Sequence, residues 1–347
     1  MTHVRQLTAV VLFALLALPL ASAQKYAITD LGTLSGTESF ASAVNSSGAV
    51  AGSATVDPDI FTHAFSWTKN GGITDLGTLG GDLSIGNALS SSGVVAGGSQ
   101  LNGDFNFDAF ITVSGTLLDL GSLGGQFSNA TGVNKAGQVV GASTVVGEGA
   151  THAFYWDARH GMKDLGTLGG TNSQATAIGS EGVTVGGADL GDGVTSDAAY
   201  WDSKGIHDIG NLGGGSALAL SVNEDGTQIV GQSIIATGDT HGFLYTKKTH
   251  VMTDLGTLGG TQSQANAISS EDTQVVGTST DAGDVDSLAF LWTPKKGMVD
   301  LNTKFAKGAG AGWSLQTANS VNSKGQIAGT GTLNGATHAF LLTPVSN

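Results

Sequence analysis

Short apolar segments alternate with polar, glycine-rich turns along the chain after residue 23. An Asp-Leu-Gly-Thr-Leu-Gly-Gly-like heptapeptide recurs, with its aspartate at positions 30, 75, 119, 164, 208, 254 and 300. Neighbouring aspartates are therefore 44 to 46 residues apart. Self-similarity at a fixed spacing of about 20–50 residues is the sequence signature of a solenoid or a propeller.

Each interval contains the same four apolar segments, and the pattern predicts a strand for each. The first has small residues two positions apart, as in 41–44, which is typical of a strand with one crowded face. The second is exemplified by residues 138–141, the third by the aromatic residues at 154–156, and the fourth by residues 73–79. Four strands in about 45 residues have the size of one blade of a β-propeller.

The two ends of the chain together supply one further repeat. Residues 26–34 match a fourth strand with nothing before it, and residues 313–345 match the first three strands with no fourth strand after them. Pairing these segments would close a ring and remove its exposed edges. The sequence therefore predicts an all-β fold: a seven-bladed β-propeller of four-stranded antiparallel blades. This single domain would cover residues 24–347, with its last blade shared by 25–34 and 313–345. An open β-solenoid is the competing fold.

Composition agrees with this interpretation and narrows the function. The chain has 55 glycines in 347 residues, which disfavours long helices because each interior glycine costs a helix roughly 1 kcal/mol. It has no cysteine, which excludes disulfides, cysteine-based zinc sites and a lipoprotein anchor. With 14 basic and 28 acidic residues the formal charge is −14. A nucleic-acid partner is therefore disfavoured, because phosphate binding depends on Lys and Arg.

The first 23 residues have the pattern of a cleavable signal peptide. Arg5 precedes an apolar run from 7 to 20, and Ala21-Ser22-Ala23 fits the small-residue cleavage site. We expect cleavage after Ala23 and a secreted or periplasmic protein. No second apolar stretch of this length follows, so no membrane anchor is expected. A closed ring has no edge to cover, so a monomer is expected.

The third strand of several repeats begins with His-Ala-Phe. The tripeptide stands at 63–65, 152–154 and 338–340, and His241-Gly242-Phe243 is a near match. These motifs resemble the signature of the HAF-repeat family of exported bacterial β-propeller-like proteins. The resemblance extends over the mature chain and implies export and a repeat architecture, but no particular reaction. The other three repeats lack this histidine.

The repeated histidines and aspartates are interpreted as structural. Each stands on a different repeat, so symmetry spreads them around the ring, whereas a metal ion needs several ligands within about 2–2.6 Å. We expect the histidines to bond a neighbouring strand and the aspartates to fix turns. The structural set is His63, His152, His241, His338, Asp75, Asp164 and Asp254.

The loops between the second and third strands are rich in aspartate, which predicts one acidic face of the ring. Asp281, Asp284 and Asp286 are the candidate ligands for a calcium ion, and the sequence points to no other cofactor. Their spacing departs from the Asp-x-Asp-x-Asp-Gly pattern, and no closing glutamate follows. The alternative is a solvated acidic loop.

One segment breaks the repeat. The distance from Asp300 to the apolar residue of the next strand is seven residues longer than elsewhere, and the extra residues lie within 302–312. We expect this segment to lie over the acidic face as an asymmetric binding site, because function tends to reside on loops. Its candidate residues are Lys304, Phe305, Lys307 and Trp313. The alternative is a spacer between blades.

The chain lacks His-Glu-x-x-His, Gly-x-Ser-x-Gly, a phosphate loop and a dinucleotide fingerprint. The sequence therefore favours a binding or interaction module that recognises an extracellular glycan or protein on its loop face. Two alternatives stay open. One is a polysaccharide lyase or glycosidase, since propellers build active sites from scattered loops. The other is a structural component of the cell envelope.

Overall fold

The computed structural model describes residues 24–57, 59–103, 106–147, 149–269 and 273–345. The predicted signal peptide, residues 1–23, lies outside the described residues. Within them, the only regular element that is not a strand is one 3-10 helix, η1 (Leu301–Lys304). The all-β prediction is confirmed, and no helix among the described residues has the length and apolar character to cross a membrane.

The strands form antiparallel units of four consecutive strands. Unit 1 is β2 (Ser39–Val44), β3 (Val50–Val56), β4 (Phe61–Thr68) and β5 (Gly72–Asp75). Unit 2 is β6 (Gly80–Leu89), β7 (Val95–Leu101), β8 (Phe107–Val113) and β9 (Thr116–Asp119). Unit 3 is β10 (Gly124–Val133), β11 (Val139–Val145), β12 (Thr151–Asp157) and β13 (Gly161–Asp164).

The second half of the chain repeats this pattern. Unit 4 is β14 (Gly169–Ile178), β15 (Thr184–Leu190), β16 (Ser196–Asp202) and β17 (Gly205–Gly210). Unit 5 is β18 (Gly213–Val222), β19 (Gln228–Ile235), β20 (Thr240–Thr246) and β21 (Val251–Asp254). Unit 6 is β22 (Gly259–Ile268), β23 (Val275–Asp281), β24 (Ser287–Thr293) and β25 (Gly297–Asp300).

The last unit combines both ends of the chain, and we call it the split unit. It contains β26 (Trp313–Val321), β27 (Ile327–Leu333), β28 (Ala336–Val345) and β1 (Lys25–Asp30), in the sheet order β1-β28-β27-β26. β1 pairs antiparallel with β28, from Lys25 opposite Val345 to Asp30 opposite Phe340.

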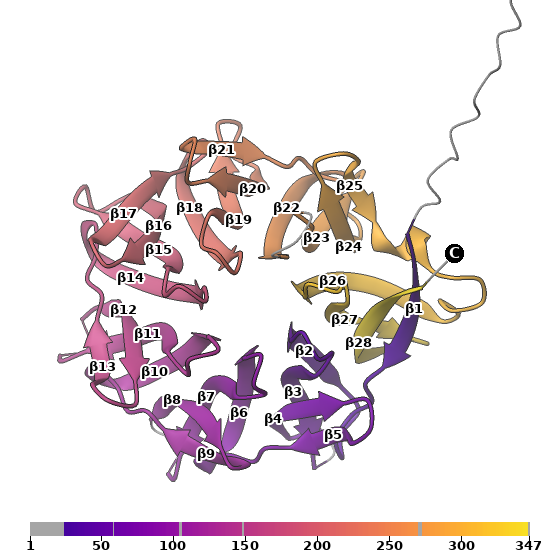
Figure 1. Cartoon of the computed structure of the whole chain (residues 1–347), viewed down its shortest axis with the longest axis horizontal. Coiled ribbons are helices and arrows are strands. Elements are labelled where there is room, and N and C mark those ends of the chain that lie inside the picture. The colour runs from indigo at the N-terminus through magenta and orange to yellow at the C-terminus, as the bar shows by residue number, and fades with distance from the viewer. Residues whose placement is uncertain (1–23, 58, 104–105, 148, 270–272, 346–347) are drawn as a thin grey trace, which may run out of the picture.

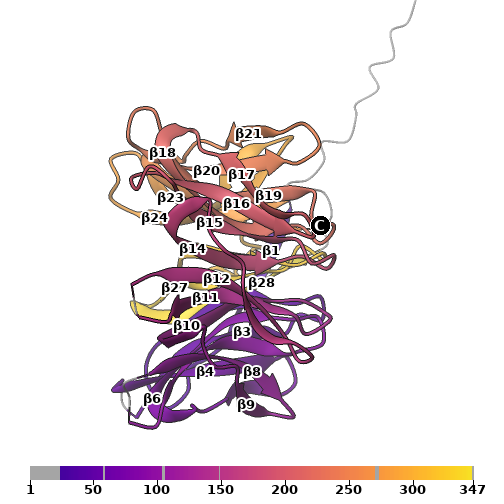
Figure 2. The ribbon, with the colours of Figure 1, turned by 90° about the vertical axis from the view of Figure 1, so that its left-hand side faces the viewer.

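The units lie around a common centre, with the first strand of each unit innermost (Figure 1). Seen from the edge, the molecule is thinner than it is wide (Figure 2). Single parallel bridges, such as Thr62 to Leu83, join some neighbouring units, so units 1–3 and units 4–6 form two twelve-stranded sheets.

The hydrophobic core is divided among the spaces between neighbouring units. The phenylalanine of the His-Ala-Phe tripeptide is fully buried in these spaces, as Phe65 shows. The backbone N–H of the preceding Ala64 donates to Ser84 Oγ of the next unit (2.8 Å), and Ser84 Oγ donates to the carbonyl of Gly77 (2.6 Å). The tripeptide therefore serves both interfaces of its unit: Phe65 packs against the split unit, and Ala64 hydrogen-bonds to unit 2.

A second set of bonds joins the innermost strands. A polar side chain at a bulge in the first strand donates to a carbonyl in the first strand of the next unit. The donor and acceptor pairs are Asn87 to Ala130, Thr131 to Ala175, Thr176 to Ala219, Asn266 to Ala318 and Asn319 to Ala41, at 2.8–3.0 Å. The last pair joins the split unit to unit 1, so the two ends of the repeat array meet through the same bond as neighbours within it.

The fourth strand of each unit is shorter than the sequence pattern predicted. The N-terminal strand was expected over 26–34, but β1 ends at Asp30. The Asp30 side chain accepts a bond from the N–H of Gly32 (2.9 Å), and Gly32 has a φ of +76°. This aspartate-stabilised turn ends the strand, because the left-handed backbone cannot continue the pleat.

Candidate binding site

The four motif histidines each contact the aspartate of the heptapeptide in their own unit. His63 Nδ1 lies 2.9 Å from Asp75, and His152 Nδ1 lies 2.7 Å from Asp164. The same contact joins His241 to Asp254 (2.8 Å) and His338 to Asp30 (2.9 Å). The pairs belong to different units, and the structure brings no two of them into one site. No cluster of three metal-ligating side chains occurs within the described residues.

Two units place an aspartate where the histidine would be. Asp108 is buried, and burial together with the neighbouring Asp119 raises its pKa to about 6. Burial also raises the pKa of Asp197 in unit 4, although a hydrogen bond from Asn211 (2.7 Å) opposes this shift. Each of these carboxyl groups lies beside a second carboxyl group, so the two units lack the opposite charge that the histidine could supply.

The calcium candidates are engaged in hydrogen bonds within their own loop and with the next strand. Asp284 accepts bonds from Thr280 Oγ1 and from the backbone N–H of Thr261 (2.7 Å), which together lower its pKa. Asp281 accepts from the backbone N–H groups of Val285 and Asp286, both at 3.0 Å. These oxygens organise the turn.

The segment that breaks the repeat lies between unit 6 and the split unit. Phe305 packs against their shared core, and Trp313 meets the rings of His338 and Phe340 edge-on at 6.4 and 6.0 Å. Lys307 is exposed. Both aromatic side chains are therefore partly buried in packing contacts.

The expected position of this segment over the acidic face needs correction. Residue 305 forms a parallel bridge with Tyr26, and the N–H of Ala306 donates to the Tyr26 carbonyl (2.8 Å). These contacts carry Lys304 to the start of β1, at the face formed by the turns between third and fourth strands. That face is opposite the acidic loops. The exposed edge of β1 attracts the segment because its backbone groups would otherwise lack partners.

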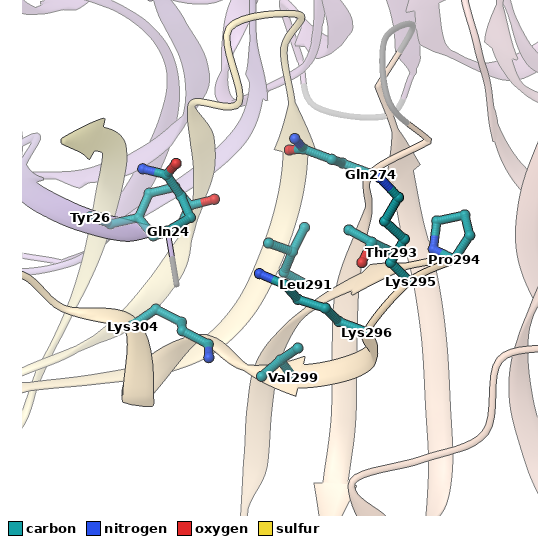
Figure 3. A pocket seen from close by; sticks show the side chains of 10 residues that line it. All are labelled: Gln24, Tyr26, Gln274, Leu291, Thr293, Pro294, Lys295, Lys296, Val299 and Lys304. Carbon is teal, nitrogen blue, oxygen red and sulfur yellow. The ribbon is translucent and has the colours of Figure 1, made fainter. Parts of the chain in front are cut away.

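A cavity of about 370 Å³ opens at this position between unit 6 and the split unit. We call it the lysine cleft and define it by Tyr26, Gln274, Leu291, Lys295, Lys296 and Lys304 (Figure 3). Its size lies near the lower end of the range of small-molecule sites, about 300–1,000 Å³. Gln274 and Tyr26 also line an adjacent cavity of about 180 Å³ that reaches Lys324.

The electrostatics of the cleft differ from those of the rest of the chain. Lys295, Lys296 and Lys304 line the cleft and Lys324 lines the adjacent cavity, although the chain has only 14 basic residues in all. No aspartate or glutamate is among the described residues that line either cavity. Within the described chain the ion pairs involve histidine and aspartate, and none neutralises these lysines. The cleft therefore concentrates positive charge on an acidic protein.

Two uncharged polar groups face the same cleft. Gln274 Oε1 is buried and is the one buried side-chain polar atom without a hydrogen-bond partner in the part of the chain that the structure describes. The Tyr26 hydroxyl points toward the cleft from the opposite side (Figure 3). Burial raises the pKa of Tyr26 to about 12, so its hydroxyl stays protonated and can donate a hydrogen bond.

The innermost strands enclose another polar opening, of about 280 Å³, at the turns between first and second strands. Several of its polar groups bond to one another across neighbouring units. Asn45 Nδ2 donates to the Ser90 carbonyl (3.1 Å), and Asn322 Nδ2 donates to the Asn45 carbonyl (2.8 Å). These bonds hold the units together, and the opening lacks the charge asymmetry of the lysine cleft.

Of the residues that define the cleft, the sequence pointed only to Lys304. Lys295 and Lys296 read as an ordinary basic turn, and Gln274 as a strand residue shared with other repeats. The departure of residues 302–312 from the repeat was the signal that marked the correct interface. Which side chains gather there depends on the path of that segment along β1.

Comparison with known proteins supports the architecture. No family model and no curated sequence matches the chain. The structure is similar to the β-propeller domain of the Trilobed protease from Pyrococcus furiosus, with a TM-score of 0.57, 9% identity and coverage of 87% of this chain and 93% of that chain. It is also similar to an oligogalacturonate lyase in complex with manganese, with a TM-score of 0.51, 11% identity and coverage of 94% and 95%.

TolB from Acinetobacter baumannii gives a TM-score of 0.51 at 11% identity. The match covers 71% of this chain and 61% of the TolB chain, so this chain corresponds to less than two thirds of TolB. At such identities the likeness concerns the fold. The chain is thus a β-propeller protein, and its role must be argued from its own residues.

Proposed function

We propose that this protein is an exported β-propeller that binds an anionic ligand in the lysine cleft. The observation that carries the proposal is the meeting of Lys295, Lys296 and Lys304 around a partly apolar cavity whose described lining contains no acidic side chain. Such a site attracts anions electrostatically and also buries part of their apolar surface. The acidic remainder of the chain, at −14 overall, repels the same ligands elsewhere.

The propeller itself we propose to be seven-bladed and closed, with the split unit as its seventh blade. The pairing of β1 with β28 and the bond from Asn319 to Ala41 support closure. The Lys25→Cys/Val345→Cys variant tests it without interference, because the chain has no cysteine. A disulfide should form quantitatively and raise Tm. Cysteines that stay reduced under oxidising conditions would contradict a closed ring.

Export and membership in the HAF-repeat family belong to the same proposal. The His-Ala-Phe tripeptides and the signal-peptide pattern of residues 1–23 support it. Expression of the full gene in a bacterium should yield protein outside the cytoplasm that begins at Gln24, as determined by N-terminal sequencing. An uncleaved, cytoplasmic product would contradict export.

Binding is tested with charge-matched variants. The triple variant Lys295→Gln/Lys296→Gln/Lys304→Gln should bind acidic oligosaccharides or acidic peptides about tenfold more weakly, because each exposed charge pair contributes about 0.2–1 kcal/mol. The control is Lys69→Gln/Lys204→Gln/Lys247→Gln, which removes three lysines from turns of other units. Calorimetric titration at low and high salt should show binding that weakens with salt. Equal losses in both variants, or no binding of any anion, would contradict the proposed function.

A further inference from the structure

The buried amide of Gln274 has lost the partners that equivalent glutamines have in other units. In unit 3, Gln138 Oε1 accepts a bond from Asn134 Nδ2 (2.6 Å), and in the split unit Gln326 Oε1 accepts from Asn322 Nδ2 (2.9 Å). In unit 6 the equivalent of this asparagine is Ser269. Its hydroxyl accepts from the Gln274 backbone N–H (3.1 Å).

A second type of donor is also replaced at this interface. In unit 5, Gln228 Oε1 accepts from the Thr273 hydroxyl of the following unit (3.3 Å). The residue that corresponds to Thr273 in the split unit is Gly325, which has no side chain, and a Cβ placed there would lie 3.5 Å from Gln274 Oε1. Two sequence changes, in turns of two neighbouring units, therefore leave Gln274 Oε1 without a donor. A buried acceptor without a partner destabilises the folded protein, so a hydrogen-bond donor from a ligand would restore a favourable interaction.

The residues that line the cleft indicate which other chemical groups its ligand must carry. Leu291, Val299 and Pro294 supply apolar surface, and Lys296 extends across it in Figure 3. Gln274 on one side and Tyr26 on the other offer an acceptor and a donor. A ligand that satisfies these groups must carry a negative charge, hydroxyl groups that donate and accept, and an apolar face.

An extended acidic peptide fits these features less well. One recurring mode of peptide binding adds a strand to an exposed edge of a sheet. At the cleft that edge is β1, and it is already occupied by the bridge from Phe305 to Tyr26 and by the bond from Ala306. A peptide would have to bind without main-chain pairing on this edge. Its acidic side chains only accept hydrogen bonds, so only its backbone N–H groups could donate to Gln274 Oε1.

We propose that the ligand of the lysine cleft is an acidic saccharide, a hexuronate whose carboxylate lies against the lysines and whose ring hydroxyl donates to Gln274 Oε1. This inference rests on the proposed function and specifies its ligand class. The C–H face of the sugar ring packs on Leu291 and Val299, and the Tyr26 hydroxyl donates to a ring or hydroxyl oxygen. The adjacent cavity beside Lys324 provides room and charge for a second sugar unit.

The test compares three probes by calorimetry: a hexuronate trisaccharide, a neutral hexose trisaccharide and tri-glutamate, which has the charge but no hydroxyl group. We expect the uronate to bind about tenfold more tightly than tri-glutamate, which corresponds to one or two net hydrogen bonds. In Gln274→Leu this preference should disappear, while affinity for tri-glutamate stays unchanged. Gln138→Leu, the equivalent change in unit 3, should leave both affinities unchanged.

A second variant keeps every residue that defines the lysine cleft and changes Ser269, which lines the adjacent cavity. Ser269→Asn restores the internal donor present in unit 3 and in the split unit, so the new amide should occupy Gln274 Oε1 and weaken uronate binding about tenfold while preserving Tm. Equal affinity for uronate and tri-glutamate would overturn the saccharide assignment and leave the anion-binding function standing. Failure of both anions to exceed the neutral sugar would overturn the proposed function itself.

Discussion

Asp119 lies beside the buried Asp108, where other units place a histidine opposite the same aspartate. This pair of carboxyl groups shows that a unit can form even when its motif histidine is replaced by an aspartate. The heptapeptide aspartate keeps its turn-forming bond, since Asp119 Oδ1 still accepts from the N–H of Gly121 (2.8 Å). The position opposite varies, and unit 2 keeps two neighbouring carboxyl groups. Its interface is therefore electrostatically weaker than that of unit 1.

Asp108→His should stabilise the protein at pH 7. The substitution recreates the contact between His63 and Asp75 and removes a neighbouring like charge. With screening by solvent taken into account, we expect the free energy of unfolding to rise by about 1–2 kcal/mol in urea titrations. Asp197→His is the matched control and should gain less, because Asn211 already donates to Asp197. A loss of stability in Asp108→His would contradict this explanation.

The raised pKa of Asp108 predicts that the stability of the folded protein depends on pH. The pKa of Asp108 is about 6 in the folded protein and 3.8 in its ordinary state. Because the folded protein holds this proton more tightly, the contribution of Asp108 to stability falls as the pH rises from about 4 to about 6 and is constant above that. Subtracting the stability curve of Asp108→Asn from that of the wild type should reveal this fall. A difference curve that is flat or rises over this interval would exclude it.

Ser173→Ala should lower the free energy of unfolding by more than the loss of one hydroxyl group suggests. Ser173 Oγ accepts from the backbone N–H of Ala153 in the preceding unit (2.9 Å) and donates to the Gly166 carbonyl (2.7 Å). Its removal leaves a buried N–H without a partner, which costs about 1–3 kcal/mol. Chemical denaturation measures the loss, and the exposed Ser203→Ala should change stability by less than about 0.5 kcal/mol. Equal effects of the two substitutions would refute the bridging role.

Gly141→Ala should be among the most damaging single-methyl additions. A Cβ at this position would lie 2.0 Å from the Asn129 carbonyl oxygen and 2.8 Å from the Phe154 ring. Overpacking against a paired backbone should cost about 3 kcal/mol. Gly149→Ala is the control, because nothing lies within 4 Å of its Cβ and its φ is not positive. The two variants should differ clearly in Tm; similar values would show that the bulge moves to accommodate the methyl group.

Calcium should leave the thermal stability almost unchanged. The Asp284 carboxylate already accepts bonds from Thr280 and Thr261, and Asp281 accepts from the backbone of its own loop. We expect Tm to shift by less than about 1 °C between EDTA and millimolar calcium, since a ligand stabilises only when it binds the folded state. Asp284→Ala should lower Tm equally in both buffers. A calcium-dependent rise in Tm that Asp284→Ala abolishes would instead establish a metal site.

Much of the architecture could be read from the heptapeptide and the His-Ala-Phe positions. The heptapeptide aspartate marks the end of a strand, as Asp75 shows, and the tripeptide phenylalanine marks a buried ring, as Phe65 shows. Because these residues recur along the chain, the strand order recurs with them. The boundaries of the fourth strands could not be read, because apolar residues such as Leu76 continue past the aspartate-stabilised turn. Those leucines are apolar because they pack between units, and a pattern of apolar residues does not distinguish this packing from a strand.

The sequence by itself determined the repeat, the all-β class and the interface at which symmetry fails, because these follow from local periodicity. Only the tertiary structure decided where residues 302–312 lie and which side chains they join. Lys304 meets Lys295 and Lys296 because the edge of β1 pairs with residues 305 and 306. Gln274 Oε1 is left without a partner because Ser269 and Gly325, in turns of two neighbouring units, replace the Asn and Thr that donate to the equivalent glutamines elsewhere. A hydrogen-bond vacancy is a property of neighbours in space, and the order of residues in one repeat does not specify it.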